Sequence, residues 1–191
     1  MIGIWASFRY LKMLKNIKML KGKGFTLVEL LVVTSIIVLL SAIILPNYQS
    51  IARQFALQRS AHKLAQDIRR VEEMAMSTKE FQGEVPKGGY GICFKLSWGD
   101  YYKIYADKNG NEKFDEEDGE METLNLERGI YIKDISPSSL SINFKSPIPT
   151  VKIKTEAGQD SATAIITLSL KSDSTKIKII KVNSIGLIDV E

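Results

Sequence analysis

The chain has 191 residues, enough for one folded domain with an anchor or tail but not for a large multidomain protein. Hydrophobic residues make up 45% and charged residues 25%, which excludes wholesale disorder. Six of the 26 basic residues lie within residues 1–24, which hold no acid, so the remainder carries 20 basic against 22 acidic residues. The net charge of +4 therefore belongs to the N-terminal segment and does not indicate nucleic-acid binding by the body.

Residues 1–24 form a basic leader that ends in Lys-Gly-Lys-Gly. Its length leaves the start of translation open, because Met13 and Met19 are alternatives to Met1. The apolar residues near Met1 are then either absent from the protein or part of an amphipathic segment on the membrane.

The segment 25–45 is apolar apart from one charge, Glu29. As a helix it would span about 30 Å, which is enough to cross the hydrocarbon core of a membrane. The basic flank before it places the N-terminus in the cytoplasm and the residues beyond about 50 outside. A secretory signal peptide is the weaker interpretation, because the run is long and ends in Pro46-Asn47-Tyr48 without a small-residue cleavage site.

Beyond Pro46 the apolar residues recur at three- and four-residue steps, which predicts an amphipathic helix over residues 51–80. The positions predicted to pack on the body are Ile51, Phe55, Leu64, Ile68, Val71 and Ala75. A bend is expected near Pro46, where a backbone hydrogen bond is lost.

From Gly88 onward the apolar period changes to two, which predicts antiparallel strands with one wet and one packed face. The predicted strands are 101–105, 130–132, 140–144, 150–154, 164–170 and 176–180. The single cysteine, Cys93, lies in a further strand-like run, so an intrachain disulfide is excluded and a buried thiol is expected.

The junction between leader and helix reads KGKGFTLVELLVV over residues 21–33. This motif closely resembles the processing site of type IV prepilins and type II secretion pseudopilins. The resemblance implies that a prepilin peptidase cleaves between Gly24 and Phe25 and that the new amine of Phe25 is methylated. It also matches Pro46 to the helix-distorting proline of these proteins, and implies as partners other pilin or pseudopilin subunits, an inner-membrane assembly platform and membrane lipid.

Glu29 is a carboxylate near one end of a membrane helix, where a charge is costly and marks a functional candidate. The resemblance implies that it pairs with the Phe25 amine of a neighbouring subunit and sets the axial register of a filament. The alternative is that Glu29 is solvated at the headgroup boundary.

An acidic segment follows the strand 101–105. Five oxygen-bearing side chains occupy positions 1, 3, 5, 9 and 12 of a calcium-type loop: Asp107, Asn109, Asn111, Asp115 and Asp118. The glycine stands at position 4 instead of 6, the twelfth residue is Asp instead of Glu, and strands are expected on both sides. These departures favour an acidic hairpin turn built on Asn-Gly. The alternative is that the loop binds Ca²⁺, and the sequence indicates no other cofactor. The segment also resembles one in H-type minor pseudopilins and related minor pilins.

The C-terminal residues 182–191 resemble the terminal strand–Gly–strand hairpin of the same minor pilins. DNA-binding relatives carry arginines around that glycine, but here the matching positions are Leu187 and Asp189, which argues against a nucleic-acid partner. His62 is predicted to lie on the surface, and no catalytic motif is present, so an enzyme is not expected.

The sequence thus predicts an α+β pilin fold with a leader (1–24), a membrane helix (25–50) and an extracytoplasmic domain (51–191). From the resemblance we expect a structural, minor subunit of a filament, which is a type II secretion pseudopilus, a type IV pilus or a competence pilus. The subunit starts as a single-pass protein of the cytoplasmic membrane. The alternative is a membrane-tethered binding module, which uses the acidic loop for Ca²⁺ or takes up DNA as a minor pilin.

Overall fold

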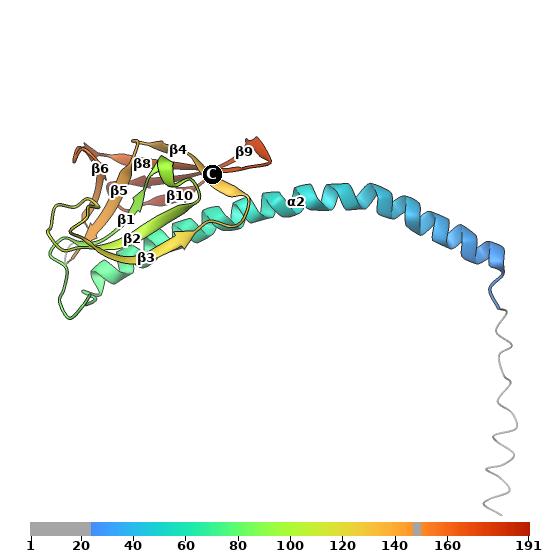
Figure 1. Cartoon of the computed structure of the whole chain (residues 1–191), viewed down its shortest axis with the longest axis horizontal. Coiled ribbons are helices and arrows are strands. Elements are labelled where there is room, and N and C mark those ends of the chain that lie inside the picture. Colours follow the sequence, from blue (N-terminus) through green and yellow to red (C-terminus); the bar gives the residue numbers. More distant parts are fainter. Residues whose placement is uncertain (1–23, 147–149) are drawn as a thin grey trace, which may run out of the picture. The chain divides into compact units, whose positions relative to one another are not determined.

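A computed structural model describes residues 24–146 and 150–191, apart from the side chains of Pro46 and Asn47 (Figure 1). It divides into two compact units, Met1–Pro46 and Asn47–Glu191. The leader up to residue 23, including the alternative starts at Met13 and Met19, lies outside the described residues.

Helix α2 (Leu27–Met76) is assigned without a break through Pro46. It ends four residues earlier than the predicted boundary near residue 80. The amide of Lys79 donates to the carbonyl of Met74, and that of Thr78 to the carbonyl of Ala75. Together with the positive φ of Thr78 (47°), these bonds form a Schellman motif, which stops the helix. The bend expected at Pro46 stays a prediction.

Within the described residues the body contains two antiparallel sheets (Figure 1). The larger has the order β3-β2-β1-β5-β6-β7, formed by β1 (Gly89–Phe94), β2 (Tyr101–Asp107), β3 (Gly119–Asn125), β5 (Leu140–Lys145), β6 (Thr150–Thr155) and β7 (Asp160–Ser161). The smaller has the order β10-β9-β8-β4, formed by β4 (Ile130–Ser136), β8 (Thr163–Leu170), β9 (Asp173–Asn183) and β10 (Ile188–Val190). A short 3₁₀ helix, η1 (Leu96–Trp98), precedes β2. A long N-terminal helix followed by these sheets confirms the α+β pilin fold.

Every strand predicted from period-two alternation is present, but the alternation did not locate β3, which the sequence indicated only as a strand expected after the acidic loop. Its sequence, GEMETLN, has no regular alternation of apolar and polar residues, and its side chains are mostly half-buried or exposed. It is the edge strand of the larger sheet and is placed by its pairing with β2, for example Tyr102 opposite Leu124. Tertiary pairing therefore decides its conformation where local pattern does not.

The core is one cluster of buried apolar side chains from α2 and both sheets. Leu64, Ile68, Val71 and Ala75 belong to it, as predicted. The prediction was wrong for two other helix positions, because Ile51 is 50% and Phe55 is 57% exposed. The fully buried stripe of α2 starts at Leu57, and residues 51–55 before it are exposed.

One buried polar contact joins α2 to the larger sheet. The hydroxyl of Tyr102 donates a 2.6 Å hydrogen bond to Oδ2 of Asp67, and both residues are buried. Burial and the neighbouring carboxylate raise the pKa of Tyr102, so the phenol keeps its proton and remains the donor. The bond satisfies a carboxylate that would otherwise be costly to bury.

We predict that Tyr102→Phe lowers the free energy of unfolding by about 1–3 kcal/mol, because it leaves the Asp67 carboxylate buried without this donor. Urea unfolding of the full chain in detergent, followed by circular dichroism, measures the change. Tyr101→Phe is the matched control, because the Tyr101 hydroxyl makes no hydrogen bond with the described residues, and it should change stability by less than about 0.5 kcal/mol. Equal losses in the two variants would contradict the role of this contact.

Candidate functional site

Gly24 and Phe25 lie directly before α2, in a segment that is neither helix nor strand. Phe25 is 85% exposed, and a Cβ placed on Gly24 would meet no atom within 4 Å among the described residues. The local fold therefore does not require glycine at position 24. A requirement for it would have to come from a partner that binds this segment.

Thr26 and Glu29 form a capping box at the start of α2. The hydroxyl oxygen of Thr26 accepts from the Glu29 amide at 3.1 Å, and Oε2 of Glu29 accepts from the Thr26 amide at 2.9 Å. The Thr26 hydroxyl also donates to Oε2 at 2.9 Å. Sequence reasoning missed this role of Glu29, although Thr-x-x-Glu before an apolar run is its signature.

The capping box leaves half of the Glu29 carboxylate free. Oε1 of Glu29 has no hydrogen-bond partner in the part of the chain that the structure describes. Glu29 can therefore fix the helix start through Oε2 and accept a bond from a cation through Oε1. The structure brings Glu29 and Phe25 to the same helix end.

The apolar run that follows is not covered by any of the described residues of its own unit. Its large apolar side chains from Phe25 to Leu45 are 48–85% exposed. In length and composition α2 contains a stretch able to cross a membrane, and none of that stretch is buried. A continuous exposed apolar surface of this kind needs lipid or other apolar helices around it.

The acidic loop between β2 and β3 is held together by its own amides. Asp107, fully buried at the end of β2, accepts from the amides of Gly110 at 2.6 Å and Glu112 at 2.7 Å. Asp118 closes the other end, accepting from the amides of Lys108 at 3.2 Å and Asp115 at 2.9 Å. Strands flank the loop, as the sequence predicts.

The remaining predicted calcium ligands bond to one another. The side-chain amides of Asn109 and Asn111 both donate to Oδ2 of Asp115, the first at 3.0 Å. Asn109 and Asn111 also accept, through their own Oδ1 atoms, from amides two residues further on. Among the described residues no group of three or more His, Cys, Asp or Glu side chains is arranged to hold a metal ion. Calcium binding by this loop stays a prediction.

The C-terminal hairpin forms as predicted, with β9 and β10 paired antiparallel. Gly186 has a φ of +86° in the turn, where a side chain would be strained. Oδ1 of Asn183 accepts from the amides of Ile185 and Leu187, which shapes the turn. Leu187 is exposed, and the lysine nearest the turn in β9, Lys181, is paired with Glu191 at 2.6 Å.

His62 and Cys93 are the histidine and the cysteine of the chain. His62 is exposed on α2, as predicted. Cys93 is buried in β1, and burial raises the pKa of its thiol to about 11, so the reactive thiolate is scarce at neutral pH.

Comparison with protein families finds a match to the prokaryotic N-terminal methylation motif over residues 19–45. The matched segment contains Gly24, Phe25 and Glu29 and stops immediately before Pro46. No curated protein and no solved structure matches the chain.

We predict a pH-dependent stability that originates in Asp118. Burial, assisted by the charges of Asp115 and Asp107, raises the pKa of Asp118 to about 6. The folded state therefore binds a proton more tightly than the unfolded state, whose Asp titrates near about 3.9. The stabilisation is complete below that value and is lost as the pH rises through about 6. Thermal unfolding should show a gain on the order of 1 kcal/mol from pH 7 to pH 5, after allowance for solvent screening.

The control is Asp118→Asn, which removes the titrating group and should flatten the profile over this range. An unchanged profile in that variant would show that another group is responsible. The same samples test the metal: higher thermal stability in Ca²⁺ than in EGTA, abolished by Asp118→Asn, would show a calcium site. A melting curve indifferent to EGTA would identify the loop as a turn.

Proposed function

The chain carries the N-terminal methylation motif of the type IV pilin and pseudopilin family, and from that premise we propose that it is a structural filament subunit. The filament would be a type IV pilus or a type II secretion pseudopilus. The observation that carries this proposal is the pairing of the matched motif with a long helix whose apolar stretch is not covered by any of the described residues. The long helix and antiparallel sheets of the pilin fold support it further.

The first step of the proposal is processing. A prepilin peptidase cleaves after Gly24, and the new amine of Phe25 is methylated. The segment before α2 is exposed and is neither helix nor strand, which supports this step, because a peptidase must reach the backbone on both sides of the scissile bond. Before cleavage the protein is a single-pass subunit with its basic leader in the cytoplasm and its body outside.

The second step is assembly, with the help of an inner-membrane platform. Apolar helices of neighbouring subunits replace lipid around the segment 25–45, so its exposed side chains become buried in the filament. The cationic amine at Phe25 of one subunit then meets the free Oε1 of Glu29 on another. In a low-dielectric filament core this attraction depends steeply on distance, which sets the stagger between subunits.

Two features of the body support a place among the minor subunits. The Asp-x-Asn-Gly-Asn loop lies between β2 and β3, and the C-terminal residues form a strand–Gly–strand hairpin. Both resemble features of H-type minor pseudopilins. The proposed position is therefore the tip or initiation complex of a filament.

We predict that Glu29→Ala and Glu29→Gln are cleaved normally but fail to enter filaments. The glutamine variant is the sharper one, because its carbonyl oxygen can keep the capping box while the charge is lost. Loss of one partner of a buried ion pair costs about 3–5 kcal/mol, so incorporation should fall by more than about a hundredfold. Quantitative immunoblotting of sheared filaments measures incorporation, and the size shift on cleavage monitors processing.

Thr26→Ala is the matched control. It removes the hydroxyl from the capping box at a cost of about 1 kcal/mol to the helix but leaves the Glu29 charge in place. This variant should assemble. Normal incorporation of Glu29→Gln would refute the charge pairing, and failure of Thr26→Ala alone would show that the cap is what assembly requires.

A further inference from the structure

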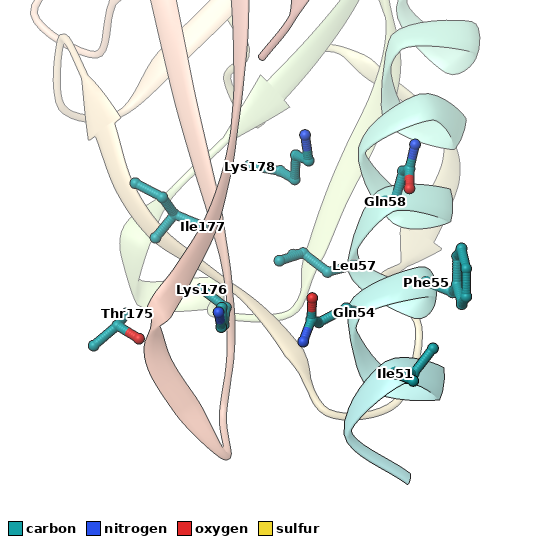
Figure 2. Close-up of a pocket in the computed structure, with 9 residues that line it drawn as sticks. All are labelled: Ile51, Gln54, Phe55, Leu57, Gln58, Thr175, Lys176, Ile177 and Lys178. Atoms are coloured by element: carbon teal, nitrogen blue, oxygen red, sulfur yellow. The ribbon is translucent and has the colours of Figure 1, made fainter. Parts of the chain in front are cut away.

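A groove separates the first turns of the body's helix from strand β9 (Figure 2). Its volume is about 360 Å³. The residues that line it are Ile51, Gln54, Phe55, Leu57 and Gln58 from α2 and Thr175, Lys176, Ile177 and Lys178 from β9. Figure 2 shows Leu57, Gln54 and Lys178 projecting into the space between helix and strand. The groove exists because the packed stripe of α2 starts only at Leu57.

The groove combines cationic and apolar groups. The ammonium groups of Lys176 and Lys178 have no carboxylate partner within 4 Å among the described residues; Lys171 and Lys181 are paired with Asp100 and Glu191. Asp173 is the nearest acid along the strand, and its carboxylate is engaged by the amide and hydroxyl of Thr175. The site is therefore positive and ready to accept an anion.

Two large apolar side chains border this positive site. Ile51 and Phe55 remain half exposed on α2, close to the end of the apolar segment. Ile51 follows Leu45, the last residue of that segment, by six positions in the sequence. In an anchored subunit this end of the body is tethered close to the membrane surface by the chain itself.

The opposite end of the body, near the C-terminus of α2, carries two lysines that lie outside the groove. The hydroxyl of Tyr90 in β1 bonds to the carbonyl of Lys79, just beyond the C-terminus of α2. Lys87 and Lys145 belong to this distant end, since Lys87 closely precedes β1 and Lys145 ends the neighbouring strand β5. Both are exposed lysines outside the groove. They provide a charge-matched comparison for Lys176 and Lys178.

We propose that the groove is a docking surface for the headgroups of anionic phospholipids in the anchored subunit before assembly. Lys176 and Lys178 bind the phosphate, and the side-chain amides of Gln54 and Gln58 donate hydrogen bonds to its oxygens. Ile51 and Phe55 enter the boundary between headgroups and acyl chains, where amphipathic surfaces gain from apolar burial. Each lysine near an anionic membrane surface should increase the docked-to-undocked ratio about fivefold.

This inference rests on the membrane anchoring in the proposed function and adds to it a preferred orientation of the body. The docked body lies against the membrane and uses the surface beside the first body turns of α2. Entry into a filament removes the helix from lipid, so the headgroup contact must break at that step. Lipid charge would thereby influence how readily the subunit leaves the membrane.

The test uses the full chain reconstituted at low density into vesicles of phosphatidylcholine or of an equimolar mixture of phosphatidylcholine and phosphatidylglycerol. A fluorophore is attached to Ser174→Cys on β9, because Ser174 is exposed and Cys93 is buried and does not react. Quenching by lipids that carry a nitroxide on the headgroup reports docking. We expect strong quenching in the mixed vesicles, weak quenching in phosphatidylcholine, and loss of the difference at high salt.

Lys176→Glu/Lys178→Glu should reduce the docked-to-undocked ratio by roughly 25-fold or more, from about fivefold per lysine. Lys87→Glu/Lys145→Glu makes the same charge change at the distant end and should retain docking. Equal quenching in the two vesicle types, or equal loss in both variants, overturns the proposal. A second copy of the chain is the other possible occupant of the groove. If energy transfer between chains replaces quenching as their density rises, the groove binds a second copy, and this outcome also overturns the proposal.

Flotation of each variant with the vesicles separates this inference from the proposed function. A chain that floats but shows no lipid-dependent quenching contradicts the groove as a lipid site and leaves the anchor intact. A chain that does not float contradicts the anchor. Circular dichroism verifies that the charge-reversed variants are folded, as expected for lysines that form no ion pair.

Discussion

The uncovered apolar surface from Phe25 to Leu45 is the constraint on which the rest of the account depends. Full burial of a Leu, Ile or Val side chain is worth roughly 1.5–3 kcal/mol, so a run of such residues left in water is strongly unfavourable. None of the described residues of this unit covers it. The segment therefore needs lipid or other apolar helices around it. In the proposed function, lipid surrounds it before assembly and the helices of neighbouring subunits surround it afterwards.

Glu29 gains its significance from the same surroundings. In water a capped glutamate at a helix start would be ordinary, but within an apolar run an uncompensated charge is costly. The capping box uses Oε2 and leaves Oε1 without a partner among the described residues. One carboxylate can thus start the helix and still accept a bond from a cation. All the residues of this arrangement lie within the matched motif at residues 19–45.

Much of the fold follows from the sequence because its periodicities are strong. The three- and four-residue spacing of Leu64, Ile68 and Val71 locates the packed face of α2, and period-two alternation locates most strands. The helix end was harder to predict, because Thr78 occupies a left-handed position where glycine is usual. Strand β3 lacks alternation and takes its conformation from β2. The exposure of Ile51 and Phe55 depends on where the body begins to cover the helix, which no local pattern records.

The candidate sites also differ in how far the sequence reveals them. The motif around Gly24, Phe25 and Glu29 is local in sequence, and the family comparison recovers it. The acidic loop shows the limit of spacing arguments, because Asp107 and Asp118 sit at ligand positions yet accept bonds from the loop's own amides. The groove beside β9 brings together residues more than a hundred positions apart in the sequence, so it becomes visible only in the folded body.

The most direct test of the account is the chemical identity of the mature N-terminus. Intact-mass and N-terminal peptide mass spectrometry should be carried out on the protein taken from native membranes. The account predicts a chain that begins at Phe25 with a methylated amine, which would establish processing by the prepilin pathway. A chain that retains its leader and begins at Met1, Met13 or Met19 would instead be a permanently anchored protein, and the filament function would have to be abandoned.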